Sequence, residues 1–139
     1  MKITNVKVDM FNWDSEPWKT GVGTRFGKTR QLGVVTVETD EGISGNAFLG
    51  SSQVGADHFA PGLIDFIKPI VMGRNPQDIG AIWWDLWKMN RTVSTYVIGA
   101  IDICLWDING KIAGQPIHLS LIHISEPTRR TPISYAVFC

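Results

Sequence analysis

The residues whose types and spacing best suit ligand chemistry lie in one polar loop, residues 14–30, between two apolar stretches. Gly21, Gly23 and Gly27 punctuate it, and glycines at short spacing can cradle a phosphate with backbone N–H groups. The dinucleotide fingerprint, however, needs a glycine where Phe26 stands, with a strand before it and a helix after it. Long loops without secondary structure are usually functional or disordered. We therefore expect a mobile flap here rather than a nucleotide site.

The remaining side chains that could act as nucleophiles or metal ligands are scattered. Cys104 lies in an apolar run and Cys139 is the last residue, so the two cysteines form neither a disulfide framework nor a zinc-ligand spacing. His58 has no partner at ligand spacing, and we expect it to be structural or exposed. Asp102 and Asp107 have apolar neighbours, which favours capping, pairing or packing. The sequence predicts no catalytic residue and no metal ligand within this chain.

Composition narrows the possible partners. The 139 residues carry thirteen basic and thirteen acidic side chains, so no basic surface for nucleic acid is expected. An apolar content of 44% allows a buried core. The sequence has no signal-peptide pattern and no apolar run near the roughly 18 residues that span a membrane. We expect a globular cytoplasmic protein with no nucleic-acid or membrane partner.

The elements that would position these residues begin with strands. Polar and apolar residues alternate over 6–13 and again over 32–39, the pattern of half-buried strands. Asp40-Glu41-Gly42 supplies turn formers and predicts a tight connection into a third strand over 44–49. The first half therefore predicts a three-stranded antiparallel meander.

Helical spacing follows in the second half. Apolar residues over 57–72 predict a first helix, with Pro61 in its first turn and Pro69 near its end. Asn75 can cap a second helix that starts at Pro76 and runs to about residue 89. Its apolar stripe, wide enough to predict core packing, comprises Ile79, Ile82, Trp83, Trp84, Leu86 and Trp87.

A third helix is predicted from Ser94 to Ala113. Apolar residues recur at intervals of three and four, and Gly114 and Pro116 end the pattern. Asp107 and Lys111 are four residues apart, so they can pair across one turn. Strands first and helices second imply an α+β domain whose helices pack on one face of the meander.

Three stretches resemble one known family. Residues 94–117 are similar to the helix Ala-hydrophobic-Asp-x-Ala-Leu-Trp-Asp-x-x-Gly-Lys-x-x-Gly-x-Pro of the enolase superfamily's N-terminal capping domain, in the mandelate racemase and muconate-lactonizing branch, with Cys104 where alanine is usual. Residues 34–45 resemble its strand and acidic turn, and residues 73–79 its Gly-x-x-Pro helix start. The resemblance runs from about residue 2 to residue 117. It implies an α+β capping domain without the (β/α) barrel.

The resemblance also implies a chemistry for the whole enzyme. Family members abstract the proton α to a carboxylate and hold the resulting enolate on Mg²⁺, with the base and metal ligands in a barrel that follows the cap. The resemblance therefore implies Mg²⁺, a small-molecule carboxylate substrate and a homo-oligomer for the full-length enzyme. We expect no activity and no bound Mg²⁺ from the 139-residue chain itself. A sugar-acid dehydratase is favoured; a racemase, a cycloisomerase or a free-standing small binding module are the alternatives.

In the family, the loops after the first and third strands close the site and select the substrate. They correspond to residues 15–28 and 50–55 of this chain. Lysine and arginine can pair with a substrate carboxylate, and aromatic side chains exclude water. The implied substrate contacts are Trp18, Lys19, Thr20, Arg25, Phe26, Ser51 and Ser52.

The last residues depart from the family. Residues 119–129 resemble the in-frame translation of a common sequencing-library adapter, and residues 133–139 resemble its continuation. A foreign segment is set aside when a fold is inferred. We therefore expect residues 1–118 to form the capping domain and residues 119–139 to be an adapter-derived tail without function.

Overall fold

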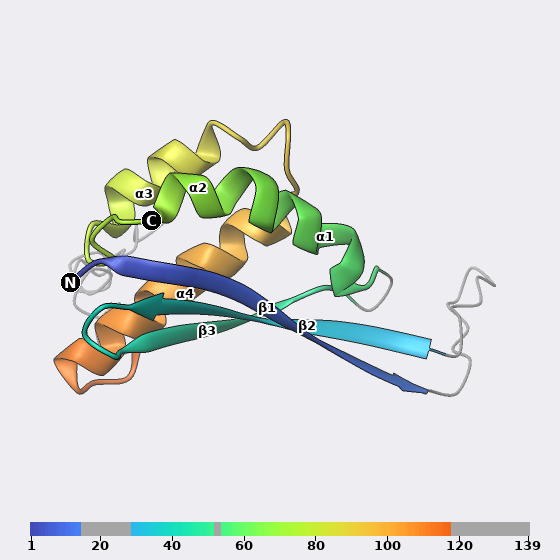
Figure 1. Ribbon diagram of the computed structural model, residues 1–139, viewed down its shortest axis with the longest axis horizontal. Coiled ribbons are helices and arrows are strands. Elements are labelled where there is room, and N and C mark those ends of the chain that lie inside the picture. Colours follow the sequence, from blue (N-terminus) through green and yellow to red (C-terminus); the bar gives the residue numbers. More distant parts are fainter. Residues whose placement is uncertain (15–28, 52–53, 118–139) are drawn as a thin grey trace, which may run out of the picture.

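The computed structural model describes residues 1–14, 29–51 and 54–117. Three strands come first and helices follow, as Figure 1 shows. The predicted α+β class and the order of its elements are confirmed. In these described ranges no helix has the length and apolar character needed to cross a membrane.

The strands form an open antiparallel sheet in the order β1-β2-β3. They span Ile3–Asp14 (β1), Thr29–Thr39 (β2) and Ser44–Leu49 (β3), so the third strand has the predicted bounds and the first two are longer. The acidic turn is tight because Gly42 adopts a φ of 79°, which a residue with a side chain rarely takes. The predicted meander is therefore confirmed.

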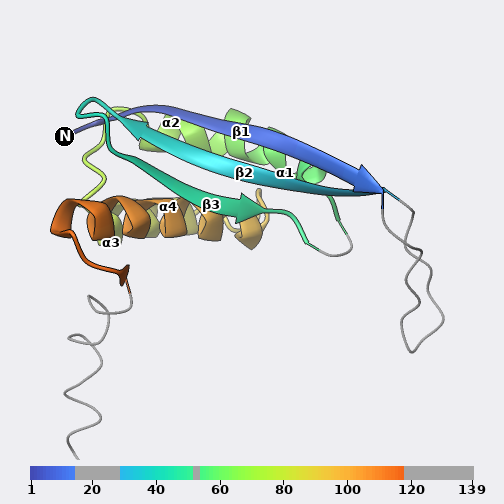
Figure 2. The same cartoon turned by 90° about the horizontal axis from the view of Figure 1, so that it is seen from below.

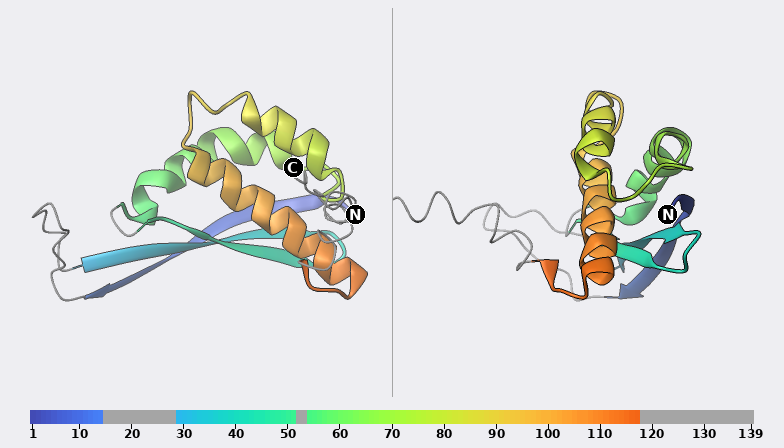
Figure 3. Two further views of the ribbon diagram at one scale, coloured as in Figure 1. Left: turned by 180° about the vertical axis from the view of Figure 1, so that it is seen from behind. Right: turned by 90° about the vertical axis from the view of Figure 1, so that its left-hand side faces the viewer.

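One face of the sheet carries the core. The inward side chains of the strands are buried, among them Val6, Val35, Val37, Ala47 and Leu49. All the helices lie on this face, with the rod of α1 and α2 (bounds below) above β1 and β2, and the long helix α4 across β3 (Figures 2 and 3). The opposite face has no covering element among the described residues, and Phe48 is 73% exposed there.

The predicted first helix is a continuous rod with a change of pitch. It consists of α1 (Ala56–Gly62), a π-helical turn η1 (Leu63–Ile67) and α2 (Lys68–Val71). The Lys68 N–H donates to the Leu63 carbonyl, five residues back, just before Pro69, which has no N–H to donate. The prediction for Pro61 was wrong: it lies inside α1 rather than in its first turn, because the helix begins at Ala56.

The second predicted helix starts later than expected. Helix α3 spans Ile79–Trp87, and residues 76–77 form a turn instead. The side chain of Asn75 does cap this turn, since its Oδ1 accepts from the Gln77 N–H at 3.2 Å, and the Asn75 carbonyl accepts from the Asp78 N–H at 3.1 Å. Asn75 therefore acts as a cap, as predicted, but it caps a turn that precedes the helix.

The core position predicted for the tryptophans of α3 was wrong. Only Ile82 and Leu86, one turn apart, are fully buried on this helix. Trp83, Trp84 and Trp87 are 36%, 62% and 40% exposed. Trp83 stacks on Trp87 with ring centroids 5.2 Å apart and planes 9° apart, and on Trp84 at 6.1 Å. A helix that packs on one side buries a narrow stripe, so the flanking aromatic rings pack on each other.

Helix α4 (Thr95–Ala113) follows its prediction closely. The Ser94 side chain caps it by accepting from the Tyr96 N–H at 3.3 Å, and Gly114 ends it in the left-handed conformation at φ 61°. Cys104 lies on its buried side. The predicted helix, cap and C-terminal glycine are therefore confirmed.

Helix α4 meets β3 at a close backbone contact. Gly45 faces the helix, and a Cβ at this position would lie 2.0 Å from the Cys104 carbonyl oxygen. Only a residue without a side chain allows this approach. The glycine therefore fixes the distance between helix and sheet.

Two side chains of α4 also bind the backbone of β3. Asp107 Oδ2 accepts from the Asn46 N–H at 2.9 Å, and Lys111 Nζ donates to the Ser44 carbonyl at 2.7 Å. Lys111 and Asp107 form the predicted pair across one turn, at 2.7 Å. The pair thus ties the helix to the edge strand rather than lying free on the surface.

Candidate functional site

The candidate site lies at the end of the sheet where the two predicted specificity loops begin. Asp14 pairs with Thr29, so the segment 15–28 leaves and rejoins the sheet at neighbouring positions. Leu49, the last residue of β3, pairs with Gly33. The two-stranded ribbon of β1 and β2 therefore continues past β3 (Figure 2), and both loops start at the same end of the sheet.

The loop after β3 has a defined start. Gly50 adopts a φ of 123°, a conformation that favours glycine. Beyond it the Ser51 N–H donates to the Val54 carbonyl at 2.8 Å, and the Val54 N–H donates to Ser51 Oγ at 2.9 Å. These bonds close the chain into a tight turn, so the serine hydroxyl contributes to the shape of the loop.

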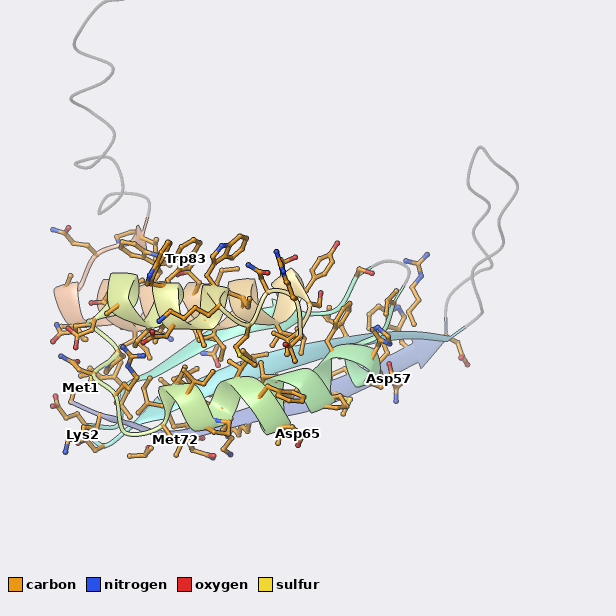
Figure 4. The ribbon with its side chains drawn as sticks, turned by 90° about the horizontal axis from the view of Figure 1, so that it is seen from above. Met1, Lys2, Asp57, Asp65, Met72 and Trp83 are labelled. Atoms are coloured by element: carbon orange, nitrogen blue, oxygen red, sulfur yellow. The ribbon has the colours of Figure 1, made fainter. Side chains whose placement is uncertain are left out.

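A side chain of β2 binds the first turn of α1, directly after this loop. Gln31 Oε1 accepts from the Asp57 N–H at 2.6 Å, at the start of α1. A Cβ on Gly55 would lie 2.8 Å from the same oxygen and 2.7 Å from Asp57 Oδ1, so a larger residue would push the contact apart. Figure 4 shows Asp57 beside the far end of the strands. Neither Gln31 nor Gly55 belongs to a motif, so no sequence signal indicated their roles.

Aromatic rings border this end of the molecule. His58 packs edge-on against Phe59 with ring centroids 5.2 Å apart, and Phe59 contacts Tyr96 of α4 at 5.3 Å. On the extended ribbon, Phe11 and Trp13 are 54% and 45% exposed. Exposed aromatic side chains therefore lie on the ribbon from which the first loop leaves.

The structure describes one of the seven predicted substrate contacts. Ser51 lies in the turn after β3, with its hydroxyl bonded within the turn. Its contact with substrate stays a prediction. The other six lie outside the described residues: Trp18, Lys19, Thr20, Arg25, Phe26 and Ser52.

The titratable residues singled out above occupy structural positions. His58 is exposed, in agreement with the prediction. Burial raises the pKa of the Asp102 carboxyl on α4. Asp107 binds the Asn46 N–H and Lys111, which is the pairing role expected of it. Within residues 1–14, 29–51 and 54–117, no three His, Cys, Asp or Glu side chains gather closely enough to hold a metal ion. The described residues therefore do not fit a magnesium site.

Cys104 is a buried thiol whose reactivity the structure predicts. Burial raises its pKa to about 12, and its Sγ lies 3.6 Å from the Val35 carbonyl oxygen. Because the thiolate is the nucleophile, the folded protein at pH 8 holds roughly a thousandfold less of it than an ordinary thiol with a pKa of 9.0. In a Cys139→Ser variant, we expect a thiol reagent to modify Cys104 only as fast as the protein unfolds.

The raised pKa of this thiol also sets the direction of a pH effect. As the pH rises, the thiol of the unfolded chain ionises before that of the folded protein. The stability that buried, neutral Cys104 contributes is therefore complete below about pH 9 and is lost as the pH rises further.

Rapid modification of Cys104 at pH 8 in the absence of denaturant would contradict the buried position.

Comparison with known proteins identifies a family. Residues 3–122 match the family described as the mandelate racemase / muconate lactonizing enzyme, N-terminal domain. Over 95 residues the chain is 34% identical to a D-mannonate dehydratase from Sphingomonas sp. and 33% identical to a D-galactonate dehydratase family member from Marinomonas sp.. Each match covers 64% of this chain and 23% of the relative. The chain thus spans about a quarter of the length of the curated relatives it matches.

A solved structure has the same fold. It is D-glucarate dehydratase from Agrobacterium tumefaciens complexed with magnesium, and it superimposes with a TM-score of 0.67 at 24% sequence identity. The match covers 87% of this chain and 32% of that chain. At this sequence identity the similarity shows the fold alone.

Proposed function

The chain belongs to the mandelate racemase / muconate lactonizing enzyme family, as its N-terminal domain, and from this premise we propose that it caps the active site of a longer sugar-acid dehydratase. The observation that carries the proposal is the common origin of the two loops. The segments 15–28 and 50–55 both leave the sheet at the end where β1 and β2 project past β3. Two loops that start together can close over one substrate.

The proposed reaction is the dehydration of a sugar acid. The enzyme removes the proton α to the carboxylate and the hydroxyl on the next carbon leaves as water, so a 2-oxo-3-deoxy acid forms after tautomerisation. One relative of this chain is named a D-mannonate dehydratase and another a D-galactonate dehydratase family member, which supports this reaction over racemisation or cycloisomerisation. Bound Mg²⁺ would offset the negative charge that develops on the carboxylate. Its ligands and the base would come from the part of the enzyme beyond this domain.

The domain's own contribution is substrate selection. Lys19 and Arg25 of the first loop are proposed to pair with anionic groups of the substrate, and Trp18 and Phe26 to exclude water. Thr20, Ser51 and Ser52 supply hydroxyls for the polar groups of a sugar chain. Gln31 and Asp57 would hold the second loop against the ribbon during closure.

The end of the domain is part of the proposal. Residues 1–118 are proposed to form the native cap, and residues 119–139 to be an adapter-derived tail in place of the native continuation. A reading frame in the genomic DNA that continues past codon 118 with a different sequence would support this. The same tail codons in the genome would contradict it.

The test of function uses the protein extended from codon 118 to the length of its relatives. With Mg²⁺ and a panel of sugar acids, we expect a 2-oxo acid from at least one substrate, and none from the 139-residue chain. Arg25→Met should raise KM by about ten- to a hundredfold, because a charge-assisted hydrogen bond contributes about 1.5–3 kcal/mol.

The matched control is Lys2→Met, which removes a positive charge at the opposite end of the sheet and should leave KM unchanged. Formation of an epimer or a lactone instead of a 2-oxo acid would overturn the dehydratase assignment. Equal KM values for the Arg25 and Lys2 variants would overturn the role of the loop.

A further inference from the structure

Helix α1 begins without a side-chain cap of its own. The residue before it is Gly55, which has no side chain that could accept a hydrogen bond from the first turn. Helices commonly have serine, threonine, aspartate or asparagine at this position, because the first N–H groups have no partner within the helix. The Asp57 N–H donates instead to Gln31 Oε1 of β2, at 2.6 Å. A strand side chain 26 residues away in the sequence therefore caps the helix.

The contact with Gln31 leaves no room for a local cap. A Cβ on Gly55 would lie 2.8 Å from Gln31 Oε1 and 3.1 Å from Gln31 Cβ, so a side chain there would displace the strand residue. The backbone of Gly55 has a φ of −69° and a ψ of 167°, which any residue can adopt. The close contact, and not the backbone conformation, therefore explains the glycine.

Both ends of the second loop, residues 50–55, lie against the same two residues of β2. At the start of the loop, Leu49 pairs with Gly33 in the strand ladder. At its end, Ala56 packs on Gly33 so closely that a Cβ on the glycine would lie 2.8 Å from the Ala56 Cβ. Asp57 follows directly and binds Gln31. The strand therefore determines where the loop leaves the sheet and where it returns.

The position of Ser51 depends on the returning end of the loop. The Val54 N–H donates to Ser51 Oγ at 2.9 Å, and the Ser51 N–H donates to the Val54 carbonyl at 2.8 Å. Only two residues separate Val54 from Asp57. A change in the place of Asp57 would therefore move Val54, and with it the hydroxyl of Ser51, which is the one described residue among the predicted substrate contacts.

We propose that Gln31 is a positioning residue for substrate selection. By capping α1 from the sheet, it holds the turn of Ser51 and Val54 at a fixed place beside the ribbon. The inference rests on the function proposed above, and it gives Gln31 a part in that function without contact to the substrate. A cap supplied by the helix itself would stabilise α1 as well, but it would not tie the loop to β2.

Amide hydrogen exchange of the 139-residue chain tests the cap without turnover. In Gln31→Ala the Asp57 N–H loses its acceptor, and we expect it to exchange at least about tenfold faster. The matched control is Thr36→Ala, which removes another side-chain bond of β2, from Thr36 Oγ1 to Asn46 Oδ1 at 3.0 Å. It should leave exchange at Asp57 unchanged. Unchanged exchange at Asp57 in Gln31→Ala would overturn the proposal.

Steady-state kinetics of the protein extended to the length of its relatives test the positioning. For the sugar acid that the wild type dehydrates fastest, Gln31→Ala should raise KM about three- to tenfold. It should change kcat by less than about twofold, because the loop contributes binding and the base lies elsewhere. Thr36→Ala should change neither constant. An unchanged KM in Gln31→Ala, together with faster exchange at Asp57, would overturn the positioning role.

A second substitution, Gly55→Ser, separates positioning from helix stability. In Gln31→Ala the smaller side chain makes room at residue 55, where a serine hydroxyl can accept from the Asp57 N–H as a local cap. In the 139-residue chain, the double variant should regain the melting temperature that Gln31→Ala loses, roughly 4–8 °C. In the extended protein, it should keep the raised KM.

Recovery of both the melting temperature and KM in the double variant would show that Gln31 only stabilises the helix, which would overturn the proposal. Absence of turnover in the extended wild type would overturn the dehydratase assignment and not the cap, which exchange at Asp57 decides by itself.

Discussion

Gly45→Ala is expected to destabilise the domain by about 3 kcal/mol or more, a large effect for the addition of one methyl group. The new methyl carbon would lie 2.0 Å from the Cys104 carbonyl oxygen and 2.9 Å from Ile108 Cγ1. The first neighbour is backbone within a helix, which cannot rotate away as a side chain can. Helix α4 would have to move off β3, with loss of packing along the strand. Urea unfolding followed by circular dichroism measures the change.

Gly99→Ala is the matched control. Gly99 lies in the same helix, and a Cβ there meets nothing within 4 Å. Alanine should stabilise this position by about 1 kcal/mol, because it has the higher helix propensity. The two substitutions add the same methyl group and are expected to change stability in opposite directions. A Gly45→Ala variant as stable as the wild type would contradict the close contact.

Asp107→Ala is expected to cost about 2–3 kcal/mol, well above the usual effect at a helix surface. The carboxylate accepts from the Asn46 N–H of β3 and from Lys111 Nζ, which itself binds the Ser44 carbonyl. Its removal leaves one backbone donor without a partner and releases the lysine from the strand. Hydrogen bonds to a charged group contribute about 1.5–3 kcal/mol each. The free energy of unfolding in urea gives the cost.

Asp85→Ala provides the comparison for Asp107. Asp85 also pairs with a nearby lysine, Lys88, and with Arg74, but within the described part of the chain it binds no strand backbone. Exposed ion pairs contribute about 0–1 kcal/mol, so this variant should lose little. Equal losses for the two aspartates would show that the contact with β3 adds nothing to the ion pair. A smaller effect of Asp107→Ala in high salt would point in the same direction.

Much of the fold could be predicted because its signals are local. Alternation in β3, the acidic turn at Gly42, and the Ser94 and Gly114 caps each depend on neighbouring residues, and the structure has them where the sequence placed them. The errors arose where tertiary packing decides. The tryptophans of α3 suit a core by composition, but the helix buries only the Ile82 and Leu86 stripe. Asn75 caps a turn, and no local pattern distinguishes this from a helix start at Pro76.

The common starting point of the two loops could be predicted from the sequence, but the contacts that support it could not. The two loops were expected together from the family resemblance, and the strand register brings their starting points to one end of the sheet. The bond between Gln31 and Asp57 joins residues 26 positions apart. Such a contact depends on how β2 and α1 pack, so no spacing in the sequence indicates it.

The contact between α4 and β3 also affects how the protein behaves in a concentrated solution. An edge strand with free N–H and C=O groups can pair with a strand of another molecule, which starts aggregation. Here the Asn46 N–H and the Ser44 carbonyl are occupied by Asp107 and Lys111. An incoming strand would have to displace both side chains to form a ladder with β3. The helix that completes the core therefore also shields the β3 edge of the sheet from intermolecular pairing.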